Sequence, residues 1–302
     1  MNLPNNAPLQ EVSDSILKNK SIRLYIKRED MIHPNISGNK WRKLYYNMRE
    51  AQRFNKTILV TFGGAYSNHI AATAALAQEF GVKSIGFIRG EETLPLNSTL
   101  FFAKECGMEF RYLDRLSYKN KNMDLIVRNY LSDIKEFCYV IPEGGTNDLG
   151  VKGTSEILKD INIDFDYVCC SCGTGGTMAG LINSIKPSQI VYGFAALKGA
   201  SFLNEEICKY TTNMQWLLNL DYHFGGYAKV DKLLIDFINL FKQKHSVPLD
   251  PIYTGKMMFG LWDLIKKDYF SKGSTIIAIH TGGLQGIKGM NEHIKTKGLK
   301  IL

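Results

Sequence analysis

The strongest constraint on the fold is an alternation of short apolar segments with helical patterns. The apolar segments are rich in β-branched and aromatic residues and have the length of buried strands. They occupy residues 57–62, 84–88, 109–113, 138–141, 166–171, 190–196 and 275–280. Helical patterns begin at Asn68, Asn97 and Lys119, and others separate the later segments. This order predicts an α/β protein with mostly parallel sheets, and about seven strands in two groups suggest two open α/β domains.

Composition is consistent with a compact protein of this class. The chain has 302 residues, of which 45% are hydrophobic and 22% charged. Its first residues, MNLPNNAPLQ, lack the pattern of a signal peptide, and no run of about 18 apolar residues occurs, so we expect a cytoplasmic protein without membrane spans. The six cysteines are scattered, which favours free thiols in a reducing compartment over a disulfide framework.

The cysteine cluster and the net charge have simpler explanations than a metal, nucleic-acid or membrane ligand. Cys169, Cys170 and Cys172 lack a second Cys or His pair at ligand spacing, so we expect small side chains of a buried strand and no metal. The net charge of +8 comes from lysines spread along the chain, and the lysine-rich C-terminal segment 287–300 has no interleaved aromatic residues. Surface lysines therefore explain the charge better than a nucleic-acid or membrane partner.

A glycine-rich turn follows the apolar segment 166–171. Gly173, Thr174, Gly175, Gly176 and Thr177 lead into a helical pattern, so their backbone N–H groups and hydroxyls are suited to bind an anion. The turn lacks the Gly-Lys-Ser/Thr ending of a P-loop and the spacing of a dinucleotide fingerprint. A phosphate site and a plain tight connection are both consistent with this turn.

The segment SGNKWRKL, residues 37–44, singles out one lysine. Lys40 follows Gly38 and Asn39, which can form a sharp turn, while Arg42 and Lys43 lie further into a predicted helix. A lysine near other cations in a partly desolvated cleft has a lowered pKa and can act as a nucleophile and base. Lys40 could equally be an ordinary surface lysine. Together with a cradle for one phosphate, however, it suggests pyridoxal phosphate.

Six segments in order resemble one enzyme family. They are KREDMIHPNISGNKWRKLYYN, TFGGAYSNHIAATAALA, PEGGTNDLGVKG, CGTGGTMAGLI, DPIYTGKMMFGL and AIHTGGLQGI. Together they resemble the pyridoxal-phosphate family that contains D-cysteine desulfhydrase and 1-aminocyclopropane-1-carboxylate deaminase, and the match covers nearly the whole chain. The resemblance implies the tryptophan synthase β-like fold, called fold type II, with the cofactor between two α/β domains.

The resemblance also implies roles for residues around the cofactor. Lys40 matches the lysine that forms a Schiff base with pyridoxal phosphate, and Lys43 matches a second lysine near its phosphate. The turn from Gly173 to Thr177 matches the phosphate loop.

Further residues match substrate-binding and catalytic positions. Ser67 matches the serine that meets the substrate carboxylate or assists proton movement, and Asn68 matches the asparagine at the phenolic oxygen of the cofactor and, with His69, lies at the expected substrate site. Tyr253 matches an active-site tyrosine, and Tyr227 matches a second one in a segment that departs from the family pattern.

Two positions distinguish activities within the family. Members that open the cyclopropane ring have Glu and Leu where this chain has Thr254 and Thr281. A glutamate would keep the ring nitrogen of the cofactor protonated, whereas a threonine hydroxyl only forms a hydrogen bond with a largely neutral pyridine. Because β-elimination tolerates this weaker electron sink, we expect elimination rather than ring opening. The resemblance also implies a small D-amino acid as the substrate, and we expect D-cysteine, which would give pyruvate, ammonia and hydrogen sulfide.

Other reactions of the same family, and a protein without catalytic activity, remain as alternatives. Deamination of 1-aminocyclopropane-1-carboxylate, or deamination or racemisation of D-serine or another D-amino acid, would fit the same family, and a non-catalytic metabolite-binding protein is a remote possibility. The resemblance further implies a homodimer. It predicts a large cofactor-binding domain of residues 1–42 and 151–302, and a small inserted α/β domain of residues 43–150.

Overall fold

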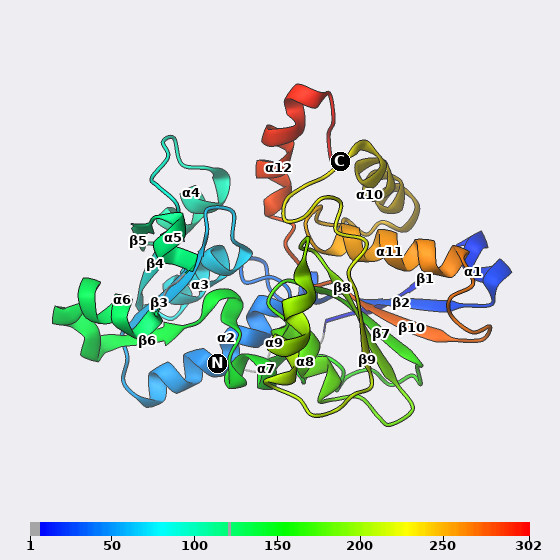
Figure 1. The fold of residues 1–302 in the computed structure, drawn as a ribbon, viewed down its shortest axis with the longest axis horizontal. Helices are drawn as coiled ribbons and strands as arrows, with labels where there is room; N and C mark the ends of the chain where they lie inside the picture. The colour runs from blue at the N-terminus through cyan, green and yellow to red at the C-terminus, as the bar shows by residue number, and fades with distance from the viewer. Residues whose placement is uncertain (1–6, 120–121) are drawn as a thin grey trace.

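The structure is a computed structural model that describes residues 7–119 and 122–302. Within these residues the strands form a six-stranded sheet and a four-stranded sheet, called here the large and the small sheet. Each sheet lies with its helices in its own lobe, and the two lobes stand side by side (Figure 1). The predicted α/β class with mostly parallel sheets is confirmed.

The large sheet pairs a strand from the first thirty residues with a strand from the last thirty. Its order is β1-β2-β10-β7-β8-β9, and all neighbours are parallel except β1 and β2. The last strand in sequence, β10, lies between β2 and β7, so Ile277 pairs with Tyr25 on one side and with Val168 on the other. The strands are β1 Leu9–Val12, β2 Arg23–Lys27, β7 Tyr167–Cys172, β8 Ile190–Ala195, β9 Trp216–Asn219 and β10 Thr275–Ile279.

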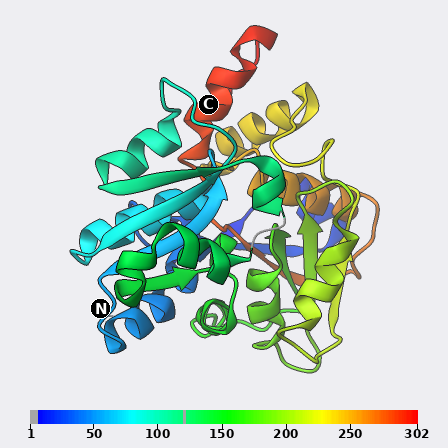
Figure 2. The ribbon, with the colours of Figure 1, turned by 60° about the vertical axis from the view of Figure 1, so that its left-hand side comes forward.

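Both faces of the large sheet are buried, which explains why its central strands are continuously apolar. Ile276 and Ala278 belong to a core formed with α10 (Lys232–His245) and α11 (Thr254–Lys266). Ile277 and Ile279 point to the opposite face and pack with residues of α8 (Gly176–Ile182) and α9 (Leu203–Cys208). The helix α1 (Ser15–Lys20) lies next to α11, and α12 (Gly286–Ile294), drawn in red, projects at the top of the molecule (Figure 2).

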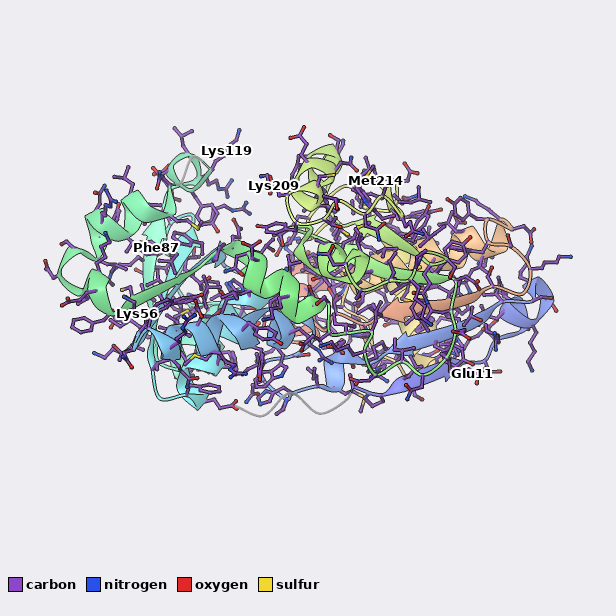
Figure 3. The ribbon with its side chains drawn as sticks, turned by 90° about the horizontal axis from the view of Figure 1, so that it is seen from below. Glu11, Lys56, Phe87, Lys119, Lys209 and Met214 are labelled. Atoms are coloured by element: carbon purple, nitrogen blue, oxygen red, sulfur yellow. The ribbon has the colours of Figure 1, made fainter. Side chains whose placement is uncertain are left out.

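The small sheet is parallel throughout, in the order β5-β4-β3-β6. Leu59 packs on one face with Trp41 of α2 and Leu76 of α3, while Phe62 packs on the other face with Tyr118 and Val127. Figure 3 shows Lys56 and Phe87 in this lobe, and Glu11 and Met214 in the lobe of the large sheet. The elements are β3 Ile58–Gly64, β4 Lys83–Arg89, β5 Met108–Leu113, β6 Cys138–Ile141, α2 Asn39–Arg53, α3 Asn68–Glu79, α4 Ser98–Glu105, α5 Arg115–Lys119, α6 Met123–Tyr130 and α7 Asp148–Thr154.

The seven predicted strands correspond to β3, β4, β5, β6, β7, β8 and β10. Three strands, β1, β2 and β9, were not predicted, because each is short and carries polar residues. The helix α3 begins at Asn68 as predicted, and Asn97 is the N-cap of α4. Lys119 ends α5 instead of beginning a helix, and α6 begins at Met123; residues 120–121 of that prediction lie outside the described residues.

The strands of the small sheet all lie between residues 58 and 141, whereas those of the large sheet lie on either side of this range. The predicted domain boundary at residue 43 falls inside α2, whose Trp41 already packs in the core of the small sheet. The division into domains stays a prediction, and its first six residues lie outside the described range.

Over residues 7–119 and 122–302, no helix has the length and apolar character needed to cross a membrane. Cys169, Cys170 and Cys172 are free thiols buried in β7. In the same described ranges, no group of three or more His, Cys, Asp and Glu side chains is arranged to hold a metal ion.

Candidate active site

Lys40 lies in the first turn of α2, directly after a sharp backbone turn. Gly38 has a φ of 69°, a region that glycine adopts without steric cost. A Cβ atom on Gly38 would lie 1.9 Å from the carbonyl oxygen of Thr281, and the same carbonyl accepts the N–H of Asn39 at 3.3 Å. The segment after β10 therefore touches the start of α2, and only glycine permits this approach.

A buried ion pair fixes the same turn from the other side. Nε and Nη2 of Arg42 each donate to a carboxylate oxygen of Glu29 at 2.9 Å, and both side chains are almost fully buried. The carbonyl of Glu29 also accepts the N–H of Gly38 at 3.1 Å. Two-point pairs of this kind are geometrically specific, so the residues around Lys40 hold its backbone in one position.

Lys40 and Lys43 reach the same group of oxygen atoms. Nζ of Lys40 lies 3.5 Å from the carbonyl oxygen of Gly144. Nζ of Lys43 donates to the carbonyl of Gly144 at 3.1 Å and lies 3.0 Å from Oγ1 of Thr146 and 3.5 Å from Oγ1 of Thr174. Burial lowers the pKa of Lys40 to about 8. Burial, and then the charge of Lys40, lower the pKa of Lys43 well below its usual value. An anion bound here would oppose this shift and stabilise the ammonium forms of both lysines.

The glycine-rich turn after β7 forms a cradle beside these lysines. Gly175 has a φ of 78°, and the hydroxyls of Thr174 and Thr146 lie 2.6 Å apart. The backbone N–H groups of residues 174–177 donate no hydrogen bond to any residue in the described part of the chain. Nδ2 of Asn39 donates to Oγ1 of Thr177 at 2.7 Å, so the cradle is tied to the turn before Lys40. Unused N–H donors next to two amines fit a phosphate group.

The start of α3 supplies a second polar edge. Oγ of Ser67 caps this helix by accepting the N–H groups of His69 at 3.2 Å and Ile70 at 3.3 Å, which leaves its own hydrogen free to be donated. The side-chain oxygen of Asn68 accepts from Nε2 of Gln285 at 2.7 Å, a contact between α3 and the residue before α12. A helix N-terminus with a free hydroxyl suits a carboxylate.

His69 is buried next to these residues as a neutral ring. Its Nε2 lies 2.7 Å from Oγ1 of Thr61, and because the Thr61 hydroxyl donates to the carbonyl of Ile141 at 2.9 Å, His69 is the donor in this pair. Burial, and then the charges of Lys40 and Lys43, lower the pKa of His69 well below its usual value. His69 therefore lines the cavity with a neutral, polar ring.

Tyr253 is positioned by an acid that the sequence had not singled out. Oδ2 of Asp250 accepts the N–H groups of Ile252 and Tyr253, both at 2.9 Å, and Oδ1 accepts the N–H and the hydroxyl of Thr254, both at 2.7 Å. The ring of Tyr227 packs against that of Tyr253 with centroids 6.3 Å apart. Burial, and next the neighbouring Tyr227, raise the pKa of Tyr253 well above its usual value, so its hydroxyl stays a proton donor.

The two threonines that were predicted to distinguish activities have different surroundings. Oγ1 of Thr281 lies 3.1 Å from Oγ of Ser171, and both residues line the cavity. Thr254 is fully buried, does not line the cavity and donates its hydroxyl to Asp250. The structure therefore does not place the Thr254 hydroxyl where the predicted contact with a ring nitrogen requires it. Successive residues at a helix start point in different directions, so Tyr253 faces the cavity and Thr254 does not.

These side chains surround one cavity of about 250 Å³ between the carboxyl ends of the strands of both sheets. The predicted site residues that line it are Lys40, Lys43, Ser67, Asn68, His69, Gly173, Thr174, Gly175, Thr177, Tyr227, Tyr253 and Thr281. Gly176 lies one step back, where an added Cβ would be 3.1 Å from Nζ of Lys43.

Several lining residues were missed by the sequence analysis. Arg89 ends β4, Glu143 follows β6, and Ser171 and Cys172 end β7. The rule that ligands bind at the carboxyl ends of parallel strands would have indicated all of them.

The fold and the cavity together define an enzyme that holds a phosphorylated cofactor between two α/β lobes, next to a lysine. A profile of the family described as pyridoxal-phosphate dependent enzyme matches residues 3–282, and the chain belongs to this family.

Two similar proteins and one similar crystal structure indicate which members of the family the chain resembles. The chain is 33% identical to a Pyrococcus furiosus protein provisionally named 1-aminocyclopropane-1-carboxylate deaminase, over 94% of this chain and 91% of that protein. It is 29% identical to an Arabidopsis thaliana protein named bifunctional D-cysteine desulfhydrase/1-aminocyclopropane-1-carboxylate deaminase, mitochondrial, over 87% of this chain and 73% of that protein. A crystal structure described as an ACC deaminase homologue superposes with a TM-score of 0.80 at 27% identity, covering 97% of this chain and 94% of that one. The predicted family, fold type and cofactor are thus confirmed.

The residues present fit pyridoxal phosphate. The unused N–H groups of residues 174–177 would hold its phosphate, Lys43 would balance the charge, and Lys40 would bind its aldehyde carbon covalently. The particular role of each residue stays a prediction.

Proposed function

We propose that this enzyme catalyses β-elimination from a small D-amino acid, with D-cysteine as the preferred substrate. D-Cysteine and water would give pyruvate, ammonia and hydrogen sulfide. The observation that carries this proposal is the hydroxyl pair of Thr281 and Ser171 in the cavity wall, 3.1 Å apart. Relatives that open the cyclopropane ring resemble one another in having a leucine at the position of Thr281, which would remove this polar edge.

Pyridoxal phosphate, when bound, supplies an electron sink that makes the α-hydrogen of an amino acid acidic. Lys40 is suited to remove that proton, because its pKa is lowered to about 8 and a useful fraction of its amine is neutral near physiological pH. The free hydrogen of Ser67 and the N-terminus of α3 would bind the substrate carboxylate. Tyr253, whose hydroxyl stays protonated, would donate a hydrogen bond to the departing sulfur.

Ring opening of 1-aminocyclopropane-1-carboxylate is the second candidate, and the names of the relatives support it equally. With one water this reaction gives 2-oxobutanoate and ammonia, whereas elimination from D-cysteine gives pyruvate and sulfide. The preference for the D-enantiomer is supported only by the resemblance. A homodimeric state and a cytoplasmic location are likewise proposals.

The test is a substrate panel assayed for both keto acids and for sulfide. The protein with bound cofactor is incubated with D-cysteine, L-cysteine, D-serine and the cyclopropane amino acid. Pyruvate and sulfide in equal amounts from D-cysteine, with the largest kcat/KM of the panel, would support the proposal. A larger kcat/KM for 2-oxobutanoate formation would favour the second candidate, and cofactor binding without turnover of any substrate would favour a non-catalytic protein.

A further inference from the structure

Lys256 is a fully buried lysine of α11 that does not line the cavity. Its Nζ donates to the carbonyl oxygens of Gly226 at 2.7 Å and His223 at 2.9 Å, and the carbonyl oxygen of Ala196 lies at 3.5 Å. In the described ranges no carboxylate lies within ion-pair distance of it. This buried ammonium forms hydrogen bonds with backbone carbonyls alone. Removing it from water without a counter-charge costs free energy, so we ask what the contacts with these carbonyls achieve.

The contacted segment, residues 221–229, has an unusual backbone. Phe224 and Ala228 have φ angles of 53° and 55°, and Gly225 and Gly226 between them have 90° and 117°. Non-glycine residues at positive φ each cost free energy and persist only where the surroundings hold them. Internal hydrogen bonds are few, mainly from Gly226 to His223 at 3.0 Å and from Lys229 to Gly226 at 3.2 Å. This segment is therefore not held by its own hydrogen bonds alone.

Tyr227 lies in this segment, directly after a carbonyl that Lys256 binds. Its ring packs against Tyr253, the N-cap residue of α11 three residues before Lys256, and both tyrosines line the cavity. Lys256 thus connects the helix that carries one cavity tyrosine to the segment that carries the other.

We infer that Lys256 is a positioning residue, whose ammonium group binds the carbonyls of His223 and Gly226 and so holds Tyr227 against Tyr253 in the cavity. The role of Tyr227 in turnover rests on the proposed function, whereas the contact between Lys256 and the segment does not. The ammonium form has three N–H groups for these carbonyls, and a neutral amine would turn a lone pair toward at least one of them. Burial lowers the pKa of Lys256 to about 8. The negative charge of Asp250 partly opposes this shift and favours the ammonium form.

The first test measures the segment directly, by amide hydrogen exchange in the protein with bound cofactor. Lys256→Met keeps the aliphatic length of the side chain and removes the ammonium, while Lys266→Met removes an exposed lysine from the end of the same helix. We expect the amides of Gly226 and Lys229 to exchange about tenfold faster or more in Lys256→Met, from the loss of charge-assisted hydrogen bonds, and unchanged in Lys266→Met. Equal exchange in wild type and Lys256→Met would overturn the inference.

The second test asks whether Lys256 acts through Tyr227. With the best substrate of the panel, Lys256→Met should lower kcat by about 10- to 100-fold, the scale expected for a displaced group. In a Tyr227→Phe background the same substitution should have little further effect, because the hydroxyl it positions is gone. Full additivity of the two substitutions would contradict the inference. If the wild type turns over no substrate, the proposed function fails and the exchange experiment alone decides.

The third test uses chemical rescue and covers the case in which Lys256→Met folds poorly. Lys256→Ala leaves a space lined by the same carbonyl oxygens. Ethylammonium can enter this space and donate charged hydrogen bonds to these oxygens, whereas neutral ethanol cannot replace the positive charge. Added ethylammonium should restore slow exchange of residues 221–229, while ethanol at the same concentration should not. Equal effects of both additives would show that filling the space matters and the cation does not, and would overturn the inference.

Discussion

Arg42, two residues after Lys40, forms a two-point ion pair with Glu29 that is shielded from solvent. The same glutamate accepts the N–H of Gly38 through its backbone carbonyl. One residue thereby fixes the start of α2 through its side chain and the turn before it through its main chain. The position of Lys40 thus depends on a charge pair that does not itself line the cavity.

Substituting Glu29→Gln should lower the free energy of unfolding by about 3–5 kcal/mol, because the guanidinium of Arg42 would stay buried without a counter-charge. Chemical denaturation measures this change. The exposed pair of Lys232 and Asp236 provides the control, since Asp236→Asn should cost about 0.5 kcal/mol or less. Equal losses in the two variants would show that burial of the pair has no energetic weight.

Gly38→Ala should both destabilise the protein and prevent covalent binding of pyridoxal phosphate to Lys40, because the new Cβ would meet the carbonyl oxygen of Thr281 at 1.9 Å. Gly199→Ala is a matched control: Gly199 has the same φ of 69°, but an added Cβ there meets no atom within 4 Å. In that control the free energy of unfolding should fall by only about 1–2 kcal/mol, because of backbone strain. Visible absorbance of the bound cofactor, measured beside a denaturation curve, separates the two effects. Similar behaviour of both variants would contradict the role given to the Thr281 contact.

The lowered pKa of Lys40 predicts how the cofactor-free protein captures pyridoxal phosphate as pH changes. Only the neutral amine attacks an aldehyde, so below the pKa the rate of covalent capture should rise about tenfold per pH unit. Because the pKa is lowered to about 8, the rise should level off near pH 8. Rapid-mixing absorbance measures the rate, and Lys40→Ala should show no covalent capture. A rate that keeps rising through pH 10 would indicate a lysine with an ordinary pKa.

Thr281→Val keeps the shape of the side chain and removes the hydroxyl next to Ser171. If this hydroxyl pair supports elimination, kcat for D-cysteine should fall about tenfold, the effect of one lost hydrogen bond of about 1.4 kcal/mol in the transition state, with a smaller change in KM. Ser171→Ala should have a similar effect, and the double variant should be little worse than either single variant. Unchanged kcat in Thr281→Val would remove the main support for the proposed elimination.

The sequence was sufficient for features that depend on local pattern. Continuous apolar runs marked β3, β7 and β10 because both faces of these strands are buried. The ordered motifs indicated most lining residues, from Lys40 to Thr281. Short strands with polar residues, such as β1 and β9, become strands only because the large sheet offers an edge to pair with.

Other features depend on contacts between distant residues and were not predictable from pattern. Thr254 was predicted to contact the cofactor because it stands where ring-opening relatives have a glutamate, yet its direction is set by the hydrogen bonds of Asp250. Asp250 and Lys256 carried no separate signal, since an acid before a helix and a lysine within it are common on protein surfaces. Their burial, and the carbonyls around Lys256, appear only once residues 196–226 are folded against α11.

The central place of β10 has a consequence for biosynthesis. During translation Lys40 leaves the ribosome roughly 240 residues before Thr281, yet the turn that carries it rests on the Thr281 carbonyl, and β2 has no parallel neighbour until β10 arrives. The nascent chain can therefore complete the small sheet early, while its cofactor lysine stays unpositioned. We expect a ribosome-stalled chain that ends before β10 not to bind pyridoxal phosphate covalently, so that only completed chains take up the cofactor.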